Sequence, residues 1–451
     1  MNTPNIVLIV ADTMRRDAIS RYNENIITPH LERLEKDSVV FDNAVAPSPW
    51  TVPSHASLFT GKYPSEHGLH ETKTLKDDAM FDRMNGVKNE TIAEFLVKNG
   101  YNTVGISANP FISPGSGFDR GFNFFHFFRK GTDYKKDYLN DLIDESLLNE
   151  IGFFFGKVDI LKKMVKNHKF KEIFPLFFYY YKSKRGIRQT LKDKGAISIF
   201  NIIKETSIKS PFFLFVNLMD MHDPYAKKEM LTFGEISLLD LFNIKPLPLR
   251  YKKKVKELYF DKSRIIDDFI GRTTNFLRRN NEYDDTLFIF TSDHGQALSE
   301  KDYYGHGTFL YDEIIRIPLM VKYPKNWNQP RTVKNLVSLT DIFPIIKETI
   351  NGGTFKDIEF SDRFIFSESY GRQSPIDIEL AKHKKIFETE KFRNGVEKVE
   401  RRRKAVFYGE LKLVINDSNE VEEFEKNYKQ VKVNDYPKEV DELRERLERL
   451  D

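Results

Sequence analysis

Four short runs of apolar residues, rich in β-branched and aromatic side chains, mark the chain. They are 5–11 (NIVLIVA), 103–108 (TVGISA), 212–218 (FFLFVNL) and 286–291 (TLFIFT). Continuous apolar runs of this length are typical of strands buried on both faces of a parallel sheet. Amphipathic helical patterns lie between them, at residues 91–99 and 262–279. The alternation predicts an α/β fold in which helices sandwich a large, mostly parallel sheet.

The last hundred residues have a different pattern. Residues 363–368 and 404–416 are typical of strands in an antiparallel sheet, and from Pro437 onward apolar residues recur at helical spacing. We therefore predict a catalytic domain over residues 1–350 and a small C-terminal α+β subdomain over residues 351–451, with antiparallel strands and a terminal helix.

Residues 124–210 interrupt the strand–helix alternation. They are rich in Phe, Tyr and Lys, with FFF at 153–155 and FPLFFYYYK at 174–182. We predict a helical insertion with its own small core. The alternatives are a lid over the site or a basic, aromatic surface that makes peripheral contact with a membrane.

Composition narrows the classes of function. The 451 residues include no cysteine, which excludes disulfides, thiolate metal sites and a cysteine nucleophile. A formal net charge of +4 gives no basic surplus for nucleic-acid binding. Neither a transmembrane run of apolar residues nor a secretory signal is evident, so we expect a cytoplasmic protein of unknown oligomeric state.

Polar residues follow each of the four predicted strands, and in open α/β sheets ligands bind beyond the carboxyl ends of the strands. A single Asp at such a place often only caps the next helix. Four strand ends with metal-ligand chemistry indicate one common site instead. Its members are Asp12, Asn109, Asp220 with His222, and Asp293 with His294.

The segment Ser48–Gly68 carries the candidate nucleophile. Pro53 suits the first turn of a helix and Gly61 its end, so we expect Thr51 just before the N-terminus of that helix, where the helix dipole favours an anion. A threonine hydroxyl is a weak nucleophile that a nearby metal ion can activate. The alternative is that Thr51 only caps the helix.

Four blocks in the same order resemble the sulfatase family of the alkaline phosphatase superfamily, over about residues 4–350. The tail also resembles the family's small C-terminal domain. The blocks are PNIVLIVAD from Pro4, TVPSHASLFTG from Thr51, GYNTVGIS from Gly100, and TSDHG from Thr291 with the following YGHGTFLYDEIIRIPLMV. The resemblance implies a metal-dependent ester hydrolase with the corresponding fold.

Departures from the family's pattern change the implied chemistry. Sulfatases oxidise a Cys or Ser to formylglycine, and that position is Thr51 here. Oxidation of threonine would give a ketone, because its Cβ carries a methyl group. His55 stands where the signature has Arg, His306 where the family has a late substrate Lys, and Thr13 where it has a second Asp. The Lys of the second signature is also absent, and Asn109 lies in that region.

Members of the superfamily with a threonine nucleophile resemble this pattern more closely. They are nucleotide pyrophosphatase/phosphodiesterases, phosphoethanolamine transferases and lipoteichoic acid synthases. The resemblance implies a principal metal site of Asp12, Thr51, Asp293 and His294. Asp220, His222 and His306 either hold a second metal or contact the transferred group. Catalytic roles then fall on Thr51, His222 and His306, and substrate-binding roles on His55, His67 and Asn109.

We therefore predict a metal-dependent hydrolase or transferase of phosphate or phosphonate esters that acts through a covalent intermediate on Thr51. Carboxylate and imidazole ligands favour Mn²⁺ or Zn²⁺, with Ca²⁺ or Mg²⁺ as the alternatives. The expected substrate is a small-molecule, lipid-linked or glycan-linked anionic ester. Two other functions stay open: hydrolysis of sulfate esters, and binding of an anionic glycan or lipid headgroup without catalysis.

Overall fold

The computed structural model describes residues 3–70, 83–128, 193–206, 208–223, 225, 249–325, 327, 331–353, 360, 363–371 and 390–450. Most of the predicted insertion, residues 129–192, lies outside these described residues. Its described flanks are part of the main body. Residues 124–127 form a strand and residues 196–205 a helix, in place of the helical layer predicted there.

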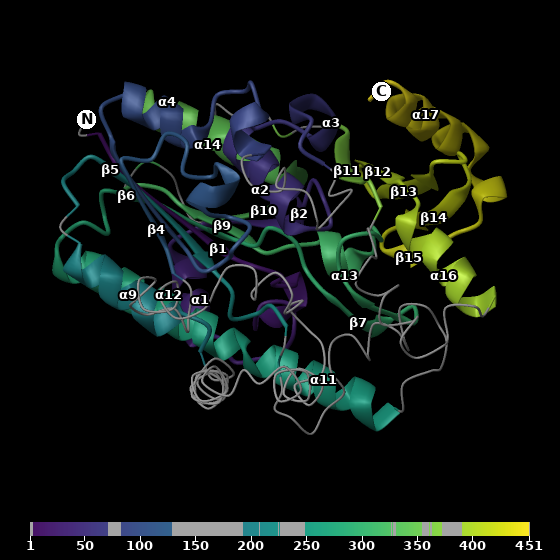
Figure 1. The fold of residues 1–451 in the computed structure, drawn as a ribbon, viewed down its shortest axis with the longest axis horizontal. Helices are drawn as coiled ribbons and strands as arrows, with labels where there is room; N and C mark the ends of the chain where they lie inside the picture. The colour runs from purple at the N-terminus through teal and green to yellow at the C-terminus, as the bar shows by residue number, and fades with distance from the viewer. Residues whose placement is uncertain are drawn as a thin grey trace, which may run out of the picture.

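An eight-stranded mixed sheet forms the centre of the molecule (Figure 1). All neighbouring strands pair in parallel except β9, which is antiparallel to both of its neighbours, β2 and β6. The predicted α/β class with a mostly parallel sheet is confirmed. The strands in spatial order are β10 (Arg331–Ser338), β2 (Val39–Val45), β9 (Leu319–Lys322), β6 (Thr286–Thr291), β1 (Asn5–Ala11), β5 (Phe212–Leu218), β3 (Asn102–Ser107) and β4 (Phe124–Phe127).

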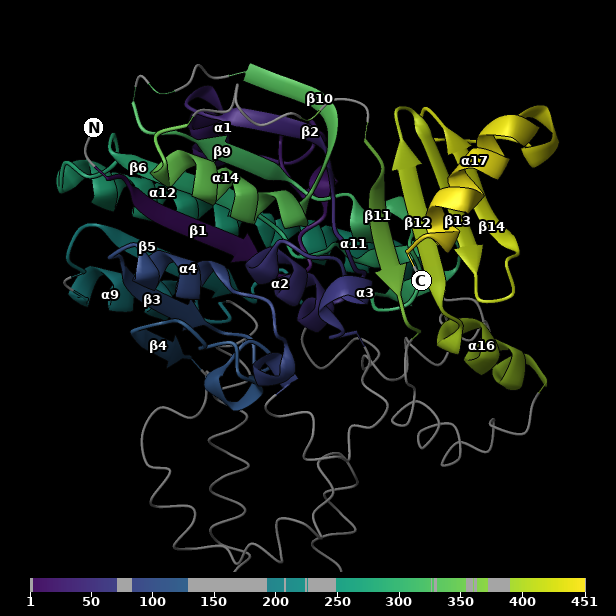
Figure 2. The same ribbon diagram turned by 90° about the horizontal axis from the view of Figure 1, so that it is seen from above.

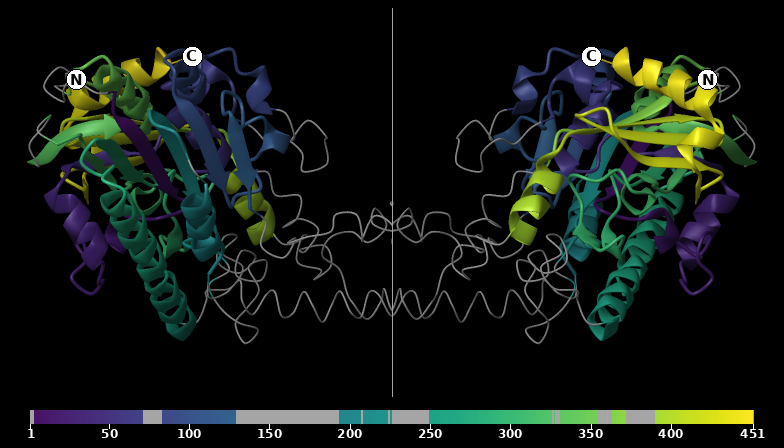
Figure 3. Two further views of the ribbon diagram at one scale, coloured as in Figure 1. Left: turned by 90° about the vertical axis from the view of Figure 1, so that its left-hand side faces the viewer. Right: turned by 90° about the vertical axis from the view of Figure 1, so that its right-hand side faces the viewer.

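Helices cover both faces of this sheet, as Figure 3 shows from the side. On one face lie α2 (Thr51–Thr60), α4 (Ile92–Lys98) and α14 (Ile342–Ile350). On the other lie α1 (Pro29–Lys36), α9 (Ala196–Glu205), α11 (Leu249–Asp261) and α12 (Ser263–Arg279). Side chains of strand β1 pack in the cores on both faces of the sheet, because successive side chains of a strand point to opposite faces. Ile6, Leu8 and Val10 join the first core, and Val7 and Ile9 the second.

Local signals explain where the helices begin and end. Thr91 caps α4: its hydroxyl accepts from the Glu94 amide at 3.1 Å, and the Glu94 carboxylate accepts from the Thr91 amide at 2.9 Å. Helix α2 ends at Gly61, which adopts a left-handed φ of 68° that glycine tolerates without strain. Both ends agree with the sequence prediction.

The C-terminal residues form a second, five-stranded antiparallel sheet beside the carboxyl end of β1 (Figure 2). Its strands are β11 (Ile365–Ser369), β12 (Arg403–Tyr408), β13 (Leu411–Asn416), β14 (Val421–Lys426) and β15 (Lys429–Gln430). Helix α17 (Pro437–Glu448) packs on this sheet through Val440, Leu443 and Leu447, as its apolar spacing predicts. Helix α16 (Glu390–Glu400) leads into β12. The domain boundary at residue 350 stays a prediction.

Within the described part of the chain, we find no helix with the length and hydropathy required to cross a bilayer.

A partly buried ion pair holds the chain after β1 against β7 (Ala297–Glu300). Arg15 lies 2.9 Å from the Glu300 carboxylate, and Lys256 lies 2.8 Å from it. Burial alone would raise the pKa of Glu300, but Arg15 and Lys256 lower it to about 2 from an ordinary 4.5. The ionised form is therefore the stabilised one in the folded protein.

We expect Glu300→Gln to reduce the free energy of unfolding by roughly 2 kcal/mol at pH 7. A carboxyl group whose pKa is depressed by folding contributes stability above its unfolded pKa and loses it as the pH falls toward the folded pKa. Denaturant titrations should therefore show the difference at pH 7 and its decline between about pH 4.5 and pH 2. A difference that does not change with pH would contradict this assignment.

Candidate metal and nucleophile site

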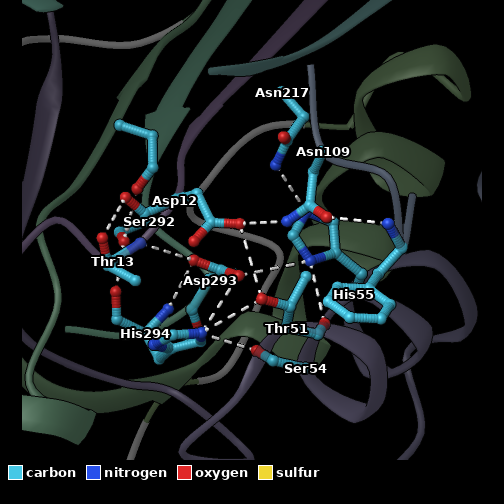
Figure 4. Close-up of polar contacts among 12 residues, drawn as sticks. Asp12, Thr13, Thr51, Ser54, His55, Asn109, Asn217, Ser292, Asp293 and His294 are labelled. Carbon is cyan, nitrogen blue, oxygen red and sulfur yellow. Dashed lines mark hydrogen bonds and ion pairs between the residues drawn. The ribbon is translucent and has the colours of Figure 1, made fainter. Parts of the chain in front are cut away.

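Four sequence-predicted residues meet at the carboxyl ends of the parallel strands (Figure 4). Asp12 follows β1, and Asp293 and His294 follow β6. Because β1 and β6 pair in parallel with Val10 opposite Thr291, the residues that follow them emerge side by side. Thr51 reaches the same place as the first residue of α2.

Among the described residues, one group of three or more acidic or histidine side chains could hold a metal ion. It consists of Asp12, Asp293 and His294, each fully buried, with one ligand atom from each lying within 4.8 Å of the others. Asp293 Oδ1 accepts from the backbone amides of Thr13 at 3.1 Å and His294 at 2.9 Å. The other oxygen, Oδ2, has no hydrogen-bond donor, and neither has Asp12 Oδ1.

These two carboxylates fit a divalent cation. Burial and the Asp293 charge raise the pKa of Asp12 to about 6, and burial raises the pKa of Asp293 to about 7. Buried carboxylate oxygens without donors or counter-charge are costly, and a cation removes that cost. The oxygens without donors thus support a divalent metal ion at the place the sequence predicts.

His294 is neutral and is oriented so that one ring nitrogen could serve as a metal ligand. Its Nδ1 donates to the Gly295 carbonyl at 2.9 Å, which leaves Nε2 as the acceptor nitrogen facing Thr51 and Asp293. Burial lowers the pKa of His294 to about 4. A backbone hydrogen bond that fixes the tautomer in this way is the usual arrangement for an imidazole metal ligand.

The Thr51 hydroxyl lies inside this cluster. Its Oγ1 is 3.3 Å from His294 Nε2 and 3.5 Å from Asp12 Oδ2. The N-cap residue of α2 is Trp50, and Thr51 is already helical, so the structure does not favour the interpretation that Thr51 only caps the helix. Ser54 anchors the helix by donating to the Asp293 carbonyl at 2.6 Å.

Asn109, predicted to bind substrate, reaches the same cluster. Its Nδ2 donates to Asp12 Oδ2 at 2.6 Å, and its Oδ1 accepts from the Phe111 amide at 2.8 Å. The side chain therefore orients the Asp12 carboxylate in this structure.

His55 lies next to the Asp12, Asp293 and His294 cluster, and its ring nitrogens contact protein groups. It is fully buried, and its Nδ1 donates to the Thr51 carbonyl at 3.0 Å and lies 3.4 Å from Asp293 Oδ2. Its Nε2 accepts from Asn217 Nδ2 at 3.1 Å. Burial lowers the pKa of His55 to about 3, so the ring is neutral. Both nitrogens thus bind protein groups, which favours a positioning role over the predicted substrate contact.

Sequence reasoning missed two polar residues that organise the site. Asn217 fixes the His55 tautomer from β5, and a lone amide within the run FFLFVNL was the available signal. Ser292 donates to the Ala11 carbonyl at 2.6 Å and accepts from the Met14 amide at 2.9 Å, which ties the ends of β1 and β6 together.

The remaining predicted residues divide into two groups. His306 lies next to the cluster, with its ring 4.7 Å from that of His294 and 5.2 Å from that of His222. His67 instead bonds Ser57 at 3.0 Å and is not part of this group. Asp220, 1% exposed, accepts from the Lys194 amide at 2.6 Å.

Asp220, His222 and His306 do not form a metal-binding group among the described residues, so the second metal site gains no support. Burial alone would lower the pKa of His222, but the Asp223 carboxylate, 2.6 Å from its Nδ1, raises that pKa to about 9. His306 Nδ1 bonds Gln296 Oε1 at 2.7 Å. Both imidazoles are thus oriented by neighbours; His306 lies beside His294, and His222 lies beside His306.

We expect His55→Phe to weaken metal affinity by about tenfold or more, because outer-shell partners of metal ligands typically matter to that extent. Phe keeps the ring packed against Phe59, Phe118 and Phe215 but removes the contacts with Asp293 and Thr51. Competition with a chelating dye measures the affinity. His67→Phe is the matched control, since that buried histidine bonds Ser57. Unchanged affinity in His55→Phe would refute the positioning role.

Comparison with known proteins gives the family of the chain. The family model described as Sulfatase matches residues 4–351, so the chain belongs to the sulfatase family. An N-acetylglucosamine-6-O-sulfatase of Bacteroides thetaiotaomicron is 24% identical over 429 residues, which cover 86% of this chain and 71% of that protein. An ulvan-active sulfatase of Formosa agariphila is 24% identical over 359 residues, 76% of this chain and 60% of that protein. The chain thus spans well under the full length of both relatives.

Among solved structures, the phosphonate monoester hydrolase of Agrobacterium radiobacter superposes with a TM-score of 0.65 at 18% sequence identity. The match covers 99% of this chain and 95% of that one. At this identity the likeness establishes the fold, including the C-terminal sheet. The expected enzyme class, a hydrolase of the sulfatase family, is supported by these findings together.

Proposed function

We propose that this chain cleaves phosphate or phosphonate esters, with Thr51 as the nucleophile that takes up the transferred group. The observation that carries the proposal is the position of Thr51 Oγ1, which lies 3.3 Å from His294 Nε2 and 3.5 Å from Asp12 Oδ2 at the start of α2. A hydroxyl is buried there among the residues that would hold a cation.

The chemistry of threonine separates this proposal from the formylglycine mechanism. A formylglycine is an aldehyde made from Cys or Ser, and the chain has no cysteine. Thr51 stands at that position, and its Cβ methyl group prevents formation of an aldehyde. The intact hydroxyl can still attack phosphorus. A phosphate or phosphonate group accepts an alcohol nucleophile readily when the negative charge on its oxygens is neutralised.

Asp12, Asp293 and His294 would hold the divalent cation, whose chemistry is to lower the pKa of a nearby hydroxyl and offset charge on the transferred group. Asn109 fixes the orientation of the Asp12 carboxylate. Thr51 Oγ1 forms the new bond to phosphorus as the bond to the leaving oxygen breaks, and water or an acceptor alcohol then releases the group.

His222 and His306 would contact the equatorial oxygens of the transferred group. The His306 ring lies beside His294 and the His222 ring beside His306, and each is oriented by a hydrogen bond through Nδ1, to the Asp223 carbonyl at 2.9 Å for His222 and to Gln296 at 2.7 Å for His306. Donors fixed in advance stabilise developing charge without reorganisation, which is where most of the rate enhancement in such sites arises.

Hydrolysis of a sulfate ester is the second candidate, and the names of the curated relatives favour it over the phosphoester reading. The two relatives described above are sulfatases, and one is named for a sulfated amino sugar. For this chain such an activity would require direct attack by the Thr51 hydroxyl on sulfur. A sulfated small molecule or glycan is the corresponding substrate.

The test compares four aryl esters, a phosphate monoester, a phosphodiester, a phosphonate monoester and a sulfate, each with Mn²⁺, Zn²⁺, Mg²⁺ or Ca²⁺ supplied. We expect turnover of at least one phosphorus ester that exceeds turnover of the sulfate. Faster turnover of the sulfate would overturn the proposal in favour of the second candidate. Metal binding without turnover of any ester would favour the third function, a non-catalytic binder of an anionic headgroup.

A further inference from the structure

A cavity lies where the edge of the large sheet meets the C-terminal sheet, a junction visible in Figure 2. Its volume is about 360 Å³, within the range of small-molecule sites. None of Asp12, Asp293 and His294 lines this cavity. The lining residues that matter here are Asn43, Arg316, Lys334, Arg363, Lys412 and Tyr428.

Arg316 is buried in the wall of this cavity with unmet hydrogen-bonding capacity. The residue is 7% exposed, and its Nε and Nη1 have no hydrogen-bond acceptor. The nearest carboxylate oxygen, Asp312 Oδ2, lies 3.7 Å from Nε. The other oxygen of Asp312 already accepts from Lys412 at 2.8 Å. A buried guanidinium keeps its charge, so donors without acceptors are costly unless something else supplies the acceptors.

Arg363 brings a second guanidinium with a donor that is not used. Its Nη1 donates to Asp341 at 2.8 Å and its Nη2 also bonds that carboxylate, whereas its Nε is buried without an acceptor. Two arginines, one before β9 and one before β11, thus line one cavity, and each has at least one buried N–H group without an acceptor.

Aromatic rings hold the Arg316 guanidinium in place. It stacks 4.8 Å from the centre of the Phe407 ring and 5.0 Å from that of Tyr428. The Tyr428 hydroxyl in turn bonds Asn43, across the junction. Tyr428 has a left-handed φ of 64°, which is unfavourable for a bulky residue. These rings lie against the faces of the guanidinium, so an acceptor for its N–H groups would lie in the plane of the guanidinium.

Charges of both signs line the cavity. Four cationic side chains line it together with two carboxylates, Glu410 and Glu425. Lys412 is neutralised by Asp312 and by Glu423, at 2.9 Å, and Arg363 by Asp341, which leaves Arg316 and the exposed Lys334 as the cations for an oxyanion. The two carboxylates suit hydroxyl donors, which phosphorylated sugars and similar molecules carry.

We propose that this cavity binds a hydroxylated small molecule through a phosphate or carboxylate group. Arg316 and Arg363 hold the oxyanion, because guanidinium groups match the oxygens of phosphate and carboxylate in pairs. Lys334 adds charge at the cavity's exposed side. The site is independent of the metal cluster and of the ester on which that cluster acts.

Isothermal titration of the metal-loaded full chain tests this site with three probes: inorganic phosphate, glucose 6-phosphate and citrate. In wild-type protein we expect two binding events for at least one probe, one at the metal cluster and one in the cavity. Asp293→Asn should remove the first event, and Arg316→Gln should weaken the second by about tenfold or more. Glucose 6-phosphate and citrate distinguish phosphate from carboxylate ligands.

Two further variants make the result decisive. Lys334→Gln changes an exposed residue, so it tests the cavity even if Arg316→Gln does not fold; we expect it to weaken the second event by a smaller factor. Lys254→Gln, exposed on α11, is the charge-matched control and should change nothing. Two results would overturn the proposal. One is that the Asp293→Asn protein binds none of the probes, and the other is that neither Arg316→Gln nor Lys334→Gln weakens the binding.

Discussion

Thr51→Val is expected to lower turnover by roughly four orders of magnitude while the protein stays folded and metal-bound. Valine matches the shape of threonine and suits the buried first turn of α2, where Thr51 is 3% exposed. It lacks the hydroxyl that lies 3.3 Å from His294 Nε2. The carboxylates of Asp12 and Asp293 are untouched. Steady-state rates with the best ester of the panel, measured beside metal content, give the result.

Thr51→Ser is the control for this substitution, because serine keeps the hydroxyl and loses only the methyl group. We expect it to retain measurable turnover. If the Val variant turned over substrate at a rate close to wild type, Thr51 would not be the nucleophile. If the Val variant lost its metal as well, Thr51 would be needed to form the site, and its separate chemical role would lose support.

Asp293→Asn is expected to lower metal affinity by at least about 100-fold, and activity with it. Asparagine can keep an oxygen at Oδ1 for the amides of Thr13 and His294, at 3.1 and 2.9 Å. It replaces Oδ2, the oxygen that has no donor, with an uncharged NH₂ group. The fold is therefore preserved while one of two charged ligands is lost.

Metal content after gel filtration and titration against a chelating dye measure this effect. Asp302→Asn, a carboxylate that is 70% exposed, is the matched control and should bind metal as the wild type does. In metal-free protein the Asn variant should unfold no earlier than wild type, because it removes a buried charge that lacks a donor. Equal metal content in Asp293→Asn and wild-type protein would contradict the assignment.

The sequence predicted the central strands well because burial on both faces leaves an uninterrupted apolar run. β1, β5 and β6 have the predicted bounds. Two strands on one side of the sheet were missed, because polar residues interrupt their apolar runs. The edge strand β10 (RTVKNLVS) and its neighbour β2 (VVFDNAV) therefore have a pattern that resembles loops.

The grouping of the candidate metal ligands was also predictable, because parallel strands bring the residues that follow them to one edge of the sheet. That rule places Asp12, Asp293 and His294 together without any knowledge of packing. The direction of a side chain does not follow from such a rule. His55, on α2, was assigned to the substrate, yet its ring turns inward to Asn217, a partner 162 residues away in the sequence. Such a pairing depends on the completed fold.

The proposal that this chain prefers phosphorus esters to sulfate esters depends on one residue, Thr51. The names of the related sulfatases favour sulfate esters instead. The family membership and the fold are common to both chemistries. What separates them is whether an unmodified hydroxyl attacks and carries the transferred group. This covalent step is the central claim of the mechanism.

The stereochemical course at phosphorus tests that claim most directly. The substrate is a chiral phosphorothioate ester, the attacking group is oxygen-labelled water or an acceptor alcohol, and the readout is the configuration of the product. Each in-line displacement inverts phosphorus, so attack by Thr51 followed by attack of water or an acceptor alcohol predicts net retention. Inversion would mean that the acceptor attacks the ester directly, and it would contradict a covalent intermediate on Thr51.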